Sequence, residues 1–245
     1  MAGSARLVML GESSHNPVIY KHQAIKALRQ LKAAGFTHFA MEMLPRSMQE
    51  KILEYQQTGK GFKEVQRYFD ENWAWGYLVP KAYEELAKAA QDIGLKIVAL
   101  DISQEMMAKF DKECIYKEYE NGKCLSTHTR RNKIWADNIT AILNQFKSNR
   151  LIAFMHRWHA VQASEYEPGL DILMQERGIN NIRLIDRIGG ISCLSQRHCE
   201  GESTEVETLK QQYFYREGFP HKHFVKAFQV HVPERKIDSD GKVRW

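Results

Sequence analysis

The stretch LVMLGESSH, residues 7–15, decides the fold that this sequence predicts. Leu7–Leu10 is an apolar run with the length of a buried strand. Gly11 then permits a tight strand exit, and Glu12 and His15 follow before a helical pattern begins. In an open parallel sheet the carboxyl ends of the strands share one edge, and ligands bind at that edge.

Further strand and helix patterns surround this stretch. Four more apolar runs have the character of buried strands, namely Phe39–Met41, Ile97–Leu100, Leu151–Met155 and Ile182–Ile185. Amphipathic helical patterns lie between the runs, at Ile19–Ala34, Arg46–Gln57, Lys81–Ile93 and Thr129–Lys147. Strands that alternate with helices imply right-handed crossovers and a mainly parallel sheet. The chain shows no internal repeat and no linker, so it predicts a single α/β domain over residues 5–245, with a mainly parallel central sheet flanked by helices.

Size and composition narrow the class of protein. A chain of 245 residues with 43% hydrophobic side chains can bury a full core. The formal net charge is +5 with Lys and Arg scattered among acids, so we expect no nucleic acid as a partner. The partner we expect is a small-molecule or peptide substrate. No apolar run approaches the roughly 20 residues of a transmembrane segment, and no signal peptide is recognisable. These features favour a cytoplasmic protein, or delivery as part of a larger secreted one. The four cysteines form no CxxC motif, which favours reduced thiols.

Ionisable residues stand at the ends of all five predicted strands. Glu42, Asp101, His156 and Asp186 each follow an apolar run directly, and the segment Gly11–His15 follows the first run. Five such exits are more than helix capping needs, although Asp101 and Asp186 serve equally well as caps of the following helices. The sequence therefore predicts a site at the carboxyl edge of the sheet.

Glu12 and His15 form the sharpest local feature at this edge. Their three-residue spacing can aim a carboxylate and an imidazole at one point, as acid–base chemistry or metal binding requires. In the alternative interpretation, Ser13 or Ser14 caps the next helix and His15 lies on the surface.

A second pair of ionisable residues leaves the fourth predicted strand. His156 and His159 are three residues apart, so both can face one site while Trp158 packs elsewhere. The spacing and the absence of the required glutamate exclude the helical HExxH zinc motif.

The helical pattern Thr129–Lys147 carries a third feature. Arg131, Trp135, Asn138 and Ile142 share one largely apolar stripe, which predicts that Arg131 and Asn138 point inward. A buried guanidinium needs an anionic partner, because burying it unpaired is very costly. Glu42, Glu12 or a substrate anion could be that partner, and a purely structural ion pair between helix and sheet is the alternative.

These motifs together resemble the erythromycin esterase-like family, within the broader group of EreA/ChaN-type, or Tiki-like, domains. The features that carry the resemblance occur in the order Gly11-Glu12-x-x-His15, Glu42, Arg131-x-x-x-Trp135-Ala136-x-Asn138 and His156-x-x-His159. In the family the matching motifs are GExxH, a strand-terminal Glu, RDxxMAxN and HNxH. The match spans residues 7–186, and the segment Trp73–Asp101 is more similar to the ChaN-type haem-binding branch.

The resemblance implies a hydrolase that acts on an ester or amide. It implies that His15 is the general base on water and that Glu12 orients it. His156 and His159 would hold the substrate or the developing oxyanion, and Arg131 would pair with the second-strand carboxylate or with a carboxylate of the substrate. The residue types agree with this scheme, because the chain has a His/Glu cluster and no nucleophile elbow.

The cofactor stays open at this point. His15, Glu42 and His159 are candidate ligands for Zn²⁺, Mn²⁺ or Co²⁺ in a metal-assisted variant of the same hydrolase. The ChaN-type branch raises haem as the less favoured alternative, with a slot lined by Trp73, Trp75, Tyr77 and Tyr83. The competing interpretation of these aromatic residues is core packing.

The sequence also departs from the esterase motifs. Asn132, Trp135 and Arg157 stand where the esterases have Asp, Met and Asn. The chain also lacks room for the large helical insertion that shapes the macrolide cleft, which argues against macrolide hydrolysis. Because domains of this type also occur inside large bacterial toxins, a non-catalytic or toxin-borne interaction domain is the alternative function.

Overall fold

The main sheet of the protein is built mainly from parallel strands. The computed structural model describes residues 3–12, 14–16, 18–74, 76, 78–115, 126–161, 168–186, 191–195, 198–201, 214–217 and 227–231. Within them the sheet has the order β3-β2-β4-β1-β5-β9-β8, and β6 pairs separately with β7. The strands are β1 (Leu7–Glu12), β2 (His38–Pro45), β3 (Lys96–Asp101), β4 (Leu151–His156), β5 (Asn181–Asp186), β6 (Ile191–Ser195), β7 (His198–Gly201), β8 (Phe214–Glu217) and β9 (Ala227–His231). All pairings from β3 to β9 are parallel, and β8 runs antiparallel to β9. The predicted α/β fold is confirmed.

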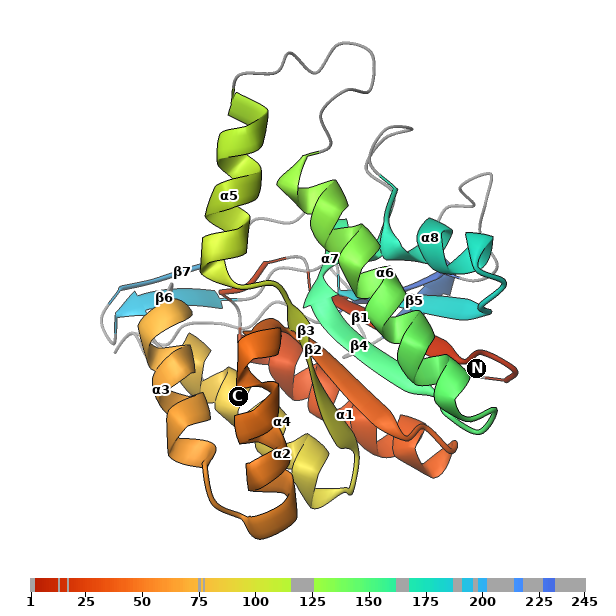
Figure 1. Ribbon diagram of the computed structural model, residues 1–245. Coiled ribbons are helices and arrows are strands. Elements are labelled where there is room, and N and C mark those ends of the chain that lie inside the picture. The colour runs from red at the N-terminus through yellow and green to blue at the C-terminus, as the bar shows by residue number, and fades with distance from the viewer. Residues whose placement is uncertain are drawn as a thin grey trace.

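Helices flank this sheet as predicted (Figure 1). They are α1 (Val18–Ala33), the 3-10 turn η1 (Arg46–Met48), α2 (Gln49–Thr58), α3 (Phe62–Asn72), α4 (Val79–Asp92), α5 (Gln104–Ile115), α6 (Thr127–Gln145), α7 (Arg157–Ala160) and α8 (Leu170–Glu176). The four predicted helical patterns correspond to α1, to η1 with α2, to α4 and to α6. The helices α3, α5, α7 and α8 were not predicted. In Figure 1, α5 projects away from the sheet.

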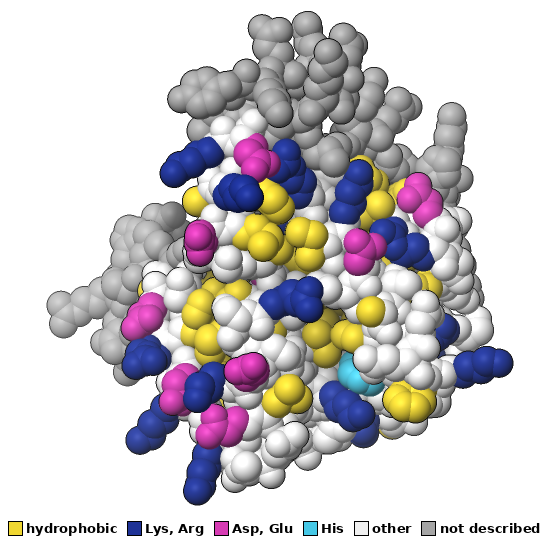
Figure 2. Space-filling model, in the orientation of Figure 1, with side chains coloured by type: hydrophobic (Ala, Val, Ile, Leu, Met, Phe, Trp, Pro, Cys, Tyr) yellow, Lys and Arg dark blue, Asp and Glu magenta, His cyan; other side chains and the backbone are white. Residues whose placement is uncertain are grey.

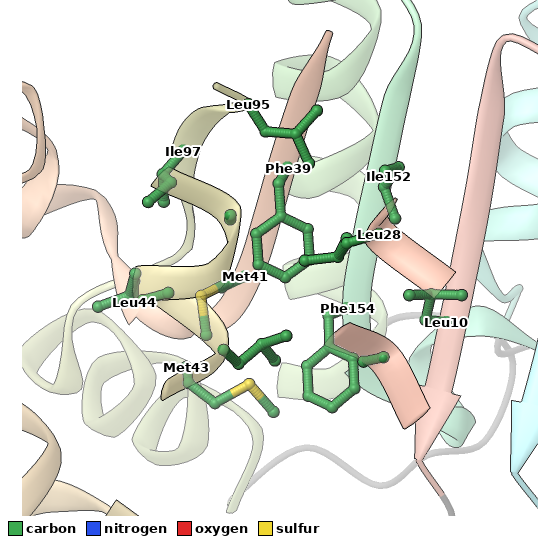
Figure 3. Close-up of a cluster of buried hydrophobic side chains, with 14 of the residues drawn as sticks. Leu10, Leu28, Phe39, Met41, Met43, Leu44, Leu95, Ile97, Ile152 and Phe154 are labelled. Carbon is green, nitrogen blue, oxygen red and sulfur yellow. The ribbon is translucent and has the colours of Figure 1, made fainter. Parts of the chain in front are cut away.

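The sheet separates two hydrophobic clusters. Because successive strand residues face opposite sides, Val8 and Leu10 of β1 belong to the cluster under α1–α4, whereas Leu7 and Met9 belong to the cluster under α6 and α8. Figure 3 shows part of the first cluster, including Leu10, Leu28, Phe39, Met41 and Phe154. Burial on both faces explains why these strands read as continuous apolar runs.

Two glutamines of α2 cover the outer edge of β3. Gln49 accepts from the backbone N–H of Ala99 and donates to the carbonyl of Ile97. Gln56, two helical turns later, accepts from the N–H of Ile97 and donates to the carbonyl of Leu95. The two side-chain amides thus take hydrogen bonds that a neighbouring strand would otherwise make.

The carboxyl end of β2 departs from the prediction. Glu42 does not close the strand, because β2 continues to Pro45. The register between β2 and β3 shifts between Met41 and Pro45, which is a bulge-type irregularity. Such irregularities re-aim side chains, and they are common next to functional sites.

The surface carries mixed charge. Figure 2 shows basic and acidic side chains interspersed over the face that it displays. No helix in the described part of the chain is long and apolar enough to cross a membrane.

Candidate active site

The first polar cluster lies where β1 ends, between α1 and α4. His15 Nδ1 lies 2.7 Å from Glu12 Oε1, and the Tyr83 hydroxyl donates to the same oxygen at 2.7 Å. Lys21 pairs with Glu12 Oε2 at 2.7 Å, and both side chains are 0% exposed. Lys21 Nζ also donates to the backbone carbonyl of His15 and lies 4.7 Å from the centre of the Tyr83 ring. One buried carboxylate therefore binds a histidine, a tyrosine and a lysine.

The charges in this cluster set its protonation. Burial opposes ionisation of Glu12, but Lys21 and His15 outweigh it and lower the pKa of Glu12. Burial also opposes a charged His15, yet the hydrogen bond and charge of Glu12 raise the pKa of His15 above 6.5. Burial and the neighbouring Glu12 raise the pKa of Tyr83 well above 10, so its hydroxyl stays a donor. The carboxylate is thus ionised, and the imidazole it contacts is more basic than usual.

A second cluster lies at the ends of β2 and β3, under α6. Arg131 donates to Asp101 through Nε at 2.9 Å and through a terminal nitrogen at 2.8 Å, and that nitrogen also donates to Glu42 Oε1 at 2.9 Å. The indole N–H of Trp135 donates to Asp101 at 3.2 Å. Despite its burial, the pKa of Glu42 lies well below its usual value because the neighbouring His159, and after it Arg131, favour the carboxylate. Burial raises the pKa of Asp101 to about 6, against the charge of Arg131.

His159 is held in one orientation on the side of Glu42. Asn132 donates its amide to the carbonyl of Pro168 at 3.0 Å, so its oxygen accepts from His159 Nδ1 at 2.6 Å. Burial lowers the pKa of His159 to about 3, which makes the ring neutral at pH 7. Its Nε2 therefore carries the lone pair, 3.3 Å from Glu42 Oε1. The ring stacks on His128 with centroids 4.0 Å apart.

His156 joins the two clusters. Its backbone N–H donates to Glu42 Oε2 at 2.6 Å, and its ring centroid lies 5.0 Å from that of His15. His156 Nδ1 accepts from the backbone N–H of Trp158 at 3.3 Å, so the neutral ring carries its proton on Nε2. The imidazole of His156, with its proton on Nε2, thus lies next to the imidazole of His15, whose Nδ1 is hydrogen-bonded to Glu12.

The structure brings the predicted site residues together at the carboxyl edge of the sheet. All six predicted catalytic residues lie in these two clusters, namely Glu12, His15, Glu42, Arg131, His156 and His159. Arg131 pairs with Glu42, one of its predicted partners, and also with Asp101. The surface interpretation of His15 is wrong, because its side chain is only 12% exposed. The side chain of Asp186 lies outside the described residues.

The position of Trp158 differs from the prediction that this side chain packs elsewhere in the fold. Trp158 is 59% exposed and its ring lies edge-on to His156, with centroids 5.1 Å apart. Trp158 is the second residue of the one-turn helix α7, in which His159 and Ala160 are the buried residues.

Three members of the site were not predicted from the sequence, namely Lys21, Asn132 as the partner of His159, and Tyr83 as a hydrogen-bond donor to Glu12. Lys21 had a signal, since it shares a helical face with Ile25 and Leu28, and a lysine on an apolar face needs a buried anion.

The described residues do not form a recognisable metal centre. No group of three His, Cys, Asp or Glu side chains in this part of the chain is placed to hold an ion. Both oxygens of Glu42 already accept hydrogen bonds, from Arg131 and from the backbone of His156. The predicted metal set of His15, Glu42 and His159 stays a prediction.

Haem does not fit the described aromatic residues. Tyr83 is 0% exposed and its hydroxyl donates to Glu12, so it is not placed to ligate iron. Trp73 is 7% exposed, and its indole N–H donates to the carbonyl of Met43. Both residues pack in the core. Trp75 and Tyr77 lie outside the described residues.

Fold and site together define an α/β protein with a His/Glu cluster at the carboxyl edge of a parallel sheet. The chain belongs to the family described as haem-binding uptake, Tiki superfamily, ChaN, whose model matches residues 1–166. This match confirms the ChaN- and Tiki-like resemblance of the sequence. No curated protein matches the chain.

Several solved structures share the fold at low sequence identity. A succinoglycan biosynthesis protein is 13% identical with a TM-score of 0.58, over 95% of this chain and 88% of that one. The type III effector HopBA1 is 14% identical with a TM-score of 0.55, over 93% and 88% of the two chains. RRSP, a MARTX toxin effector domain from Vibrio vulnificus CMCP6, is 16% identical with a TM-score of 0.51, over 74% of this chain and 33% of that one. At these identities the likeness concerns the fold alone.

Proposed function

We propose that this protein is a hydrolase that activates water with His15 and acts on an ester or amide. The observation that carries the proposal is the proximity of the His15 and His156 rings, whose centroids lie 5.0 Å apart. Glu12 holds the proton of His15 on Nδ1, which leaves Nε2 as the base. His156 presents the opposite character, because Trp158 occupies its Nδ1 and leaves Nε2–H as a donor.

The proposed reaction needs one proton transfer and one charge to stabilise. His15 Nε2 takes a proton from water as the water oxygen attacks the carbonyl carbon. The imidazolium that forms is stabilised by the ionised Glu12, 2.7 Å from Nδ1. The Nε2–H of His156 donates to the developing oxyanion, and His15 returns the proton to the leaving group.

The Glu42–Arg131 cluster supports this chemistry from the other face of the sheet. Glu42 accepts a hydrogen bond from the backbone N–H of His156 and so fixes the position of His156 at the end of β4. Arg131 helps to keep Glu42 ionised, and its guanidinium bridges Glu42 and Asp101. Arg131 thus acts on the substrate through His156, and not by direct contact.

The test is turnover of ester and peptide substrates by the wild type and by His15→Ala. We expect His15→Ala to lose about 10²–10⁴-fold in kcat/KM, the range for a general base. In the wild type, the raised pKa of His15 places the acid limb of the pH–rate profile above pH 6.5, since the base must be neutral. The matched control is His22→Ala on α1, whose side chain is 35% exposed. Equal turnover in the two variants would contradict the proposal.

A toxin-borne or non-catalytic domain is the competing function. The fold likeness to HopBA1 and to the RRSP effector domain supports it. Turnover that depends on His15 removes the non-catalytic alternative, and it leaves open whether the enzyme acts within a larger secreted protein.

A further inference from the structure

Lys21 is a buried cation with no chemical step in the proposed reaction. Lysine is almost never fully buried unless it is paired, and here both Lys21 and its partner Glu12 are 0% exposed. We infer that Lys21 is a positioning residue, which holds Glu12 ionised and fixes it against His15 so that His15 keeps its proton on Nδ1. The inference rests on the proposed function for its catalytic meaning.

The ammonium group contacts both ends of the segment that carries the base. Lys21 Nζ pairs with Glu12 Oε2 and donates to the backbone carbonyl of His15. It also lies 4.7 Å from the centre of the Tyr83 ring, within the range of a cation–π contact. The ammonium group of Lys21 on α1 therefore contacts the Glu12 carboxylate, the backbone of His15 and the Tyr83 ring of α4.

The charge of Lys21 matters more than its bulk. Without a cation, a carboxyl group buried this deeply favours its protonated form. A protonated Glu12 would offer a donor where His15 Nδ1–H now finds an acceptor, and the opposite tautomer of His15 would become accessible. That tautomer carries its proton on Nε2 and cannot act as the proposed base.

The test is the hydrogen-bonded Nδ1–H resonance of His15 in the full chain labelled with ¹⁵N-histidine. We expect Lys21→Met to lose this resonance and to move the ring ¹⁵N shifts towards the Nε2–H tautomer. Lys21→Arg, which keeps the charge, should retain the wild-type signal. Lys26→Met is the matched control, because Lys26 lies on the same helix with an exposed side chain.

A second variant keeps the test decisive if Lys21→Met does not fold. Lys21→Gln keeps a hydrogen-bond donor beside Glu12 and removes the charge, so it should lose the same resonance. A wild-type signal in a folded Lys21→Met or Lys21→Gln protein overturns the inference and reduces Lys21 to a structural ion pair. The readout needs no substrate, so this failure is distinct from an absence of turnover, which contradicts the proposed function instead.

Discussion

Arg131 binds two buried carboxylates with one guanidinium, so its removal should be costly. In Arg131→Met, Glu42 and Asp101 stay buried without their cation. Removing one partner of a buried ion pair costs about 3–5 kcal/mol, and we expect a loss of this size in the free energy of unfolding. Urea denaturation at pH 7 measures it.

The neighbouring arginine provides the control for that experiment. Arg130 pairs with Glu113, whose side chain is 42% exposed, so Arg130→Met should cost no more than about 1 kcal/mol. If the two variants lost equal free energy of unfolding, the ion pairs of Arg131 with Glu42 and Asp101 would not be the source of stability proposed here.

His159 makes the stability depend on pH. Its pKa is lowered from 6.5 to about 3 on folding, so its contribution is complete above pH 6.5 and is lost as the pH falls. Between pH 7 and pH 5 this amounts to about 2 kcal/mol. His159→Gln should therefore lose less free energy of unfolding over this interval than the wild type. Asp101, whose pKa is raised to about 6, acts in the opposite direction in both proteins.

A substitution that removes no titratable group provides the control. Gln57→Ala, at an exposed position of α2, should keep the wild-type difference in free energy of unfolding between pH 7 and pH 5. A His159→Gln protein with that same difference would mean that His159 already takes up its proton in the folded state.

Which site residues the sequence could reveal depends on where each residue lies. Glu12, Glu42 and His156 follow apolar strands, so a local pattern suffices to place them at one edge. Asn132 and Tyr83 reach the site from helices, and their partners depend on how those helices pack. Asn132 shares a face with Ala136 and Ile139, so its burial is readable from the helical period. Its contact with His159 is not, because α7 is only one turn long.

At the scale of elements, the contact between α2 and β3 makes a stability prediction. Truncating Gln49 and Gln56 to Ala leaves the backbone groups of Leu95, Ile97 and Ala99 without these partners. An unsatisfied buried group costs about 1–3 kcal/mol, and water can reach part of this edge, so we expect the double variant to lose about 2–4 kcal/mol. Thermal and urea unfolding measure the loss.

Gln57→Ala is the control for the glutamine pair. Gln57 is exposed on the same helix, so its truncation should stay within about 0.5 kcal/mol of the wild type. A double variant as stable as Gln57→Ala would show that water replaces the amides without loss.

The missed helices show the limit of periodicity at this scale. Helix α3 buries Phe62, Val65 and Phe69, a regular spacing that a closer count of the period would find. Helix α5 carries Met107 and Phe110 at helical spacing, but none of its described side chains belongs to either hydrophobic cluster. It attaches to α6 through polar contacts, such as Thr127 with Asp111, which depend on the tertiary structure.

At the scale of the whole molecule, the chain belongs to a family described as haem-binding, but its described aromatic residues are not placed to bind haem. The family description names haem binding, but the Glu12 cluster engages the hydroxyl of Tyr83, and Trp73 is packed in the core. Titration of haemin into the purified protein should therefore give no saturable shift of the Soret band. A stoichiometric shift would contradict this expectation, and its loss in Tyr83→Phe would identify the ligand.

The glutamines on α2 also affect what can join this sheet from outside. An exposed strand edge is a template on which a peptide, or another copy of the same chain, can add a strand. The side-chain amides of Gln49 and Gln56 already bind the backbone groups at this edge of β3, and a side-chain amide cannot pair with a further strand. Polymerisation through β3 first requires α2 to detach. The Gln49→Ala/Gln56→Ala protein should thus be more prone to fibril formation than its loss of stability alone would cause.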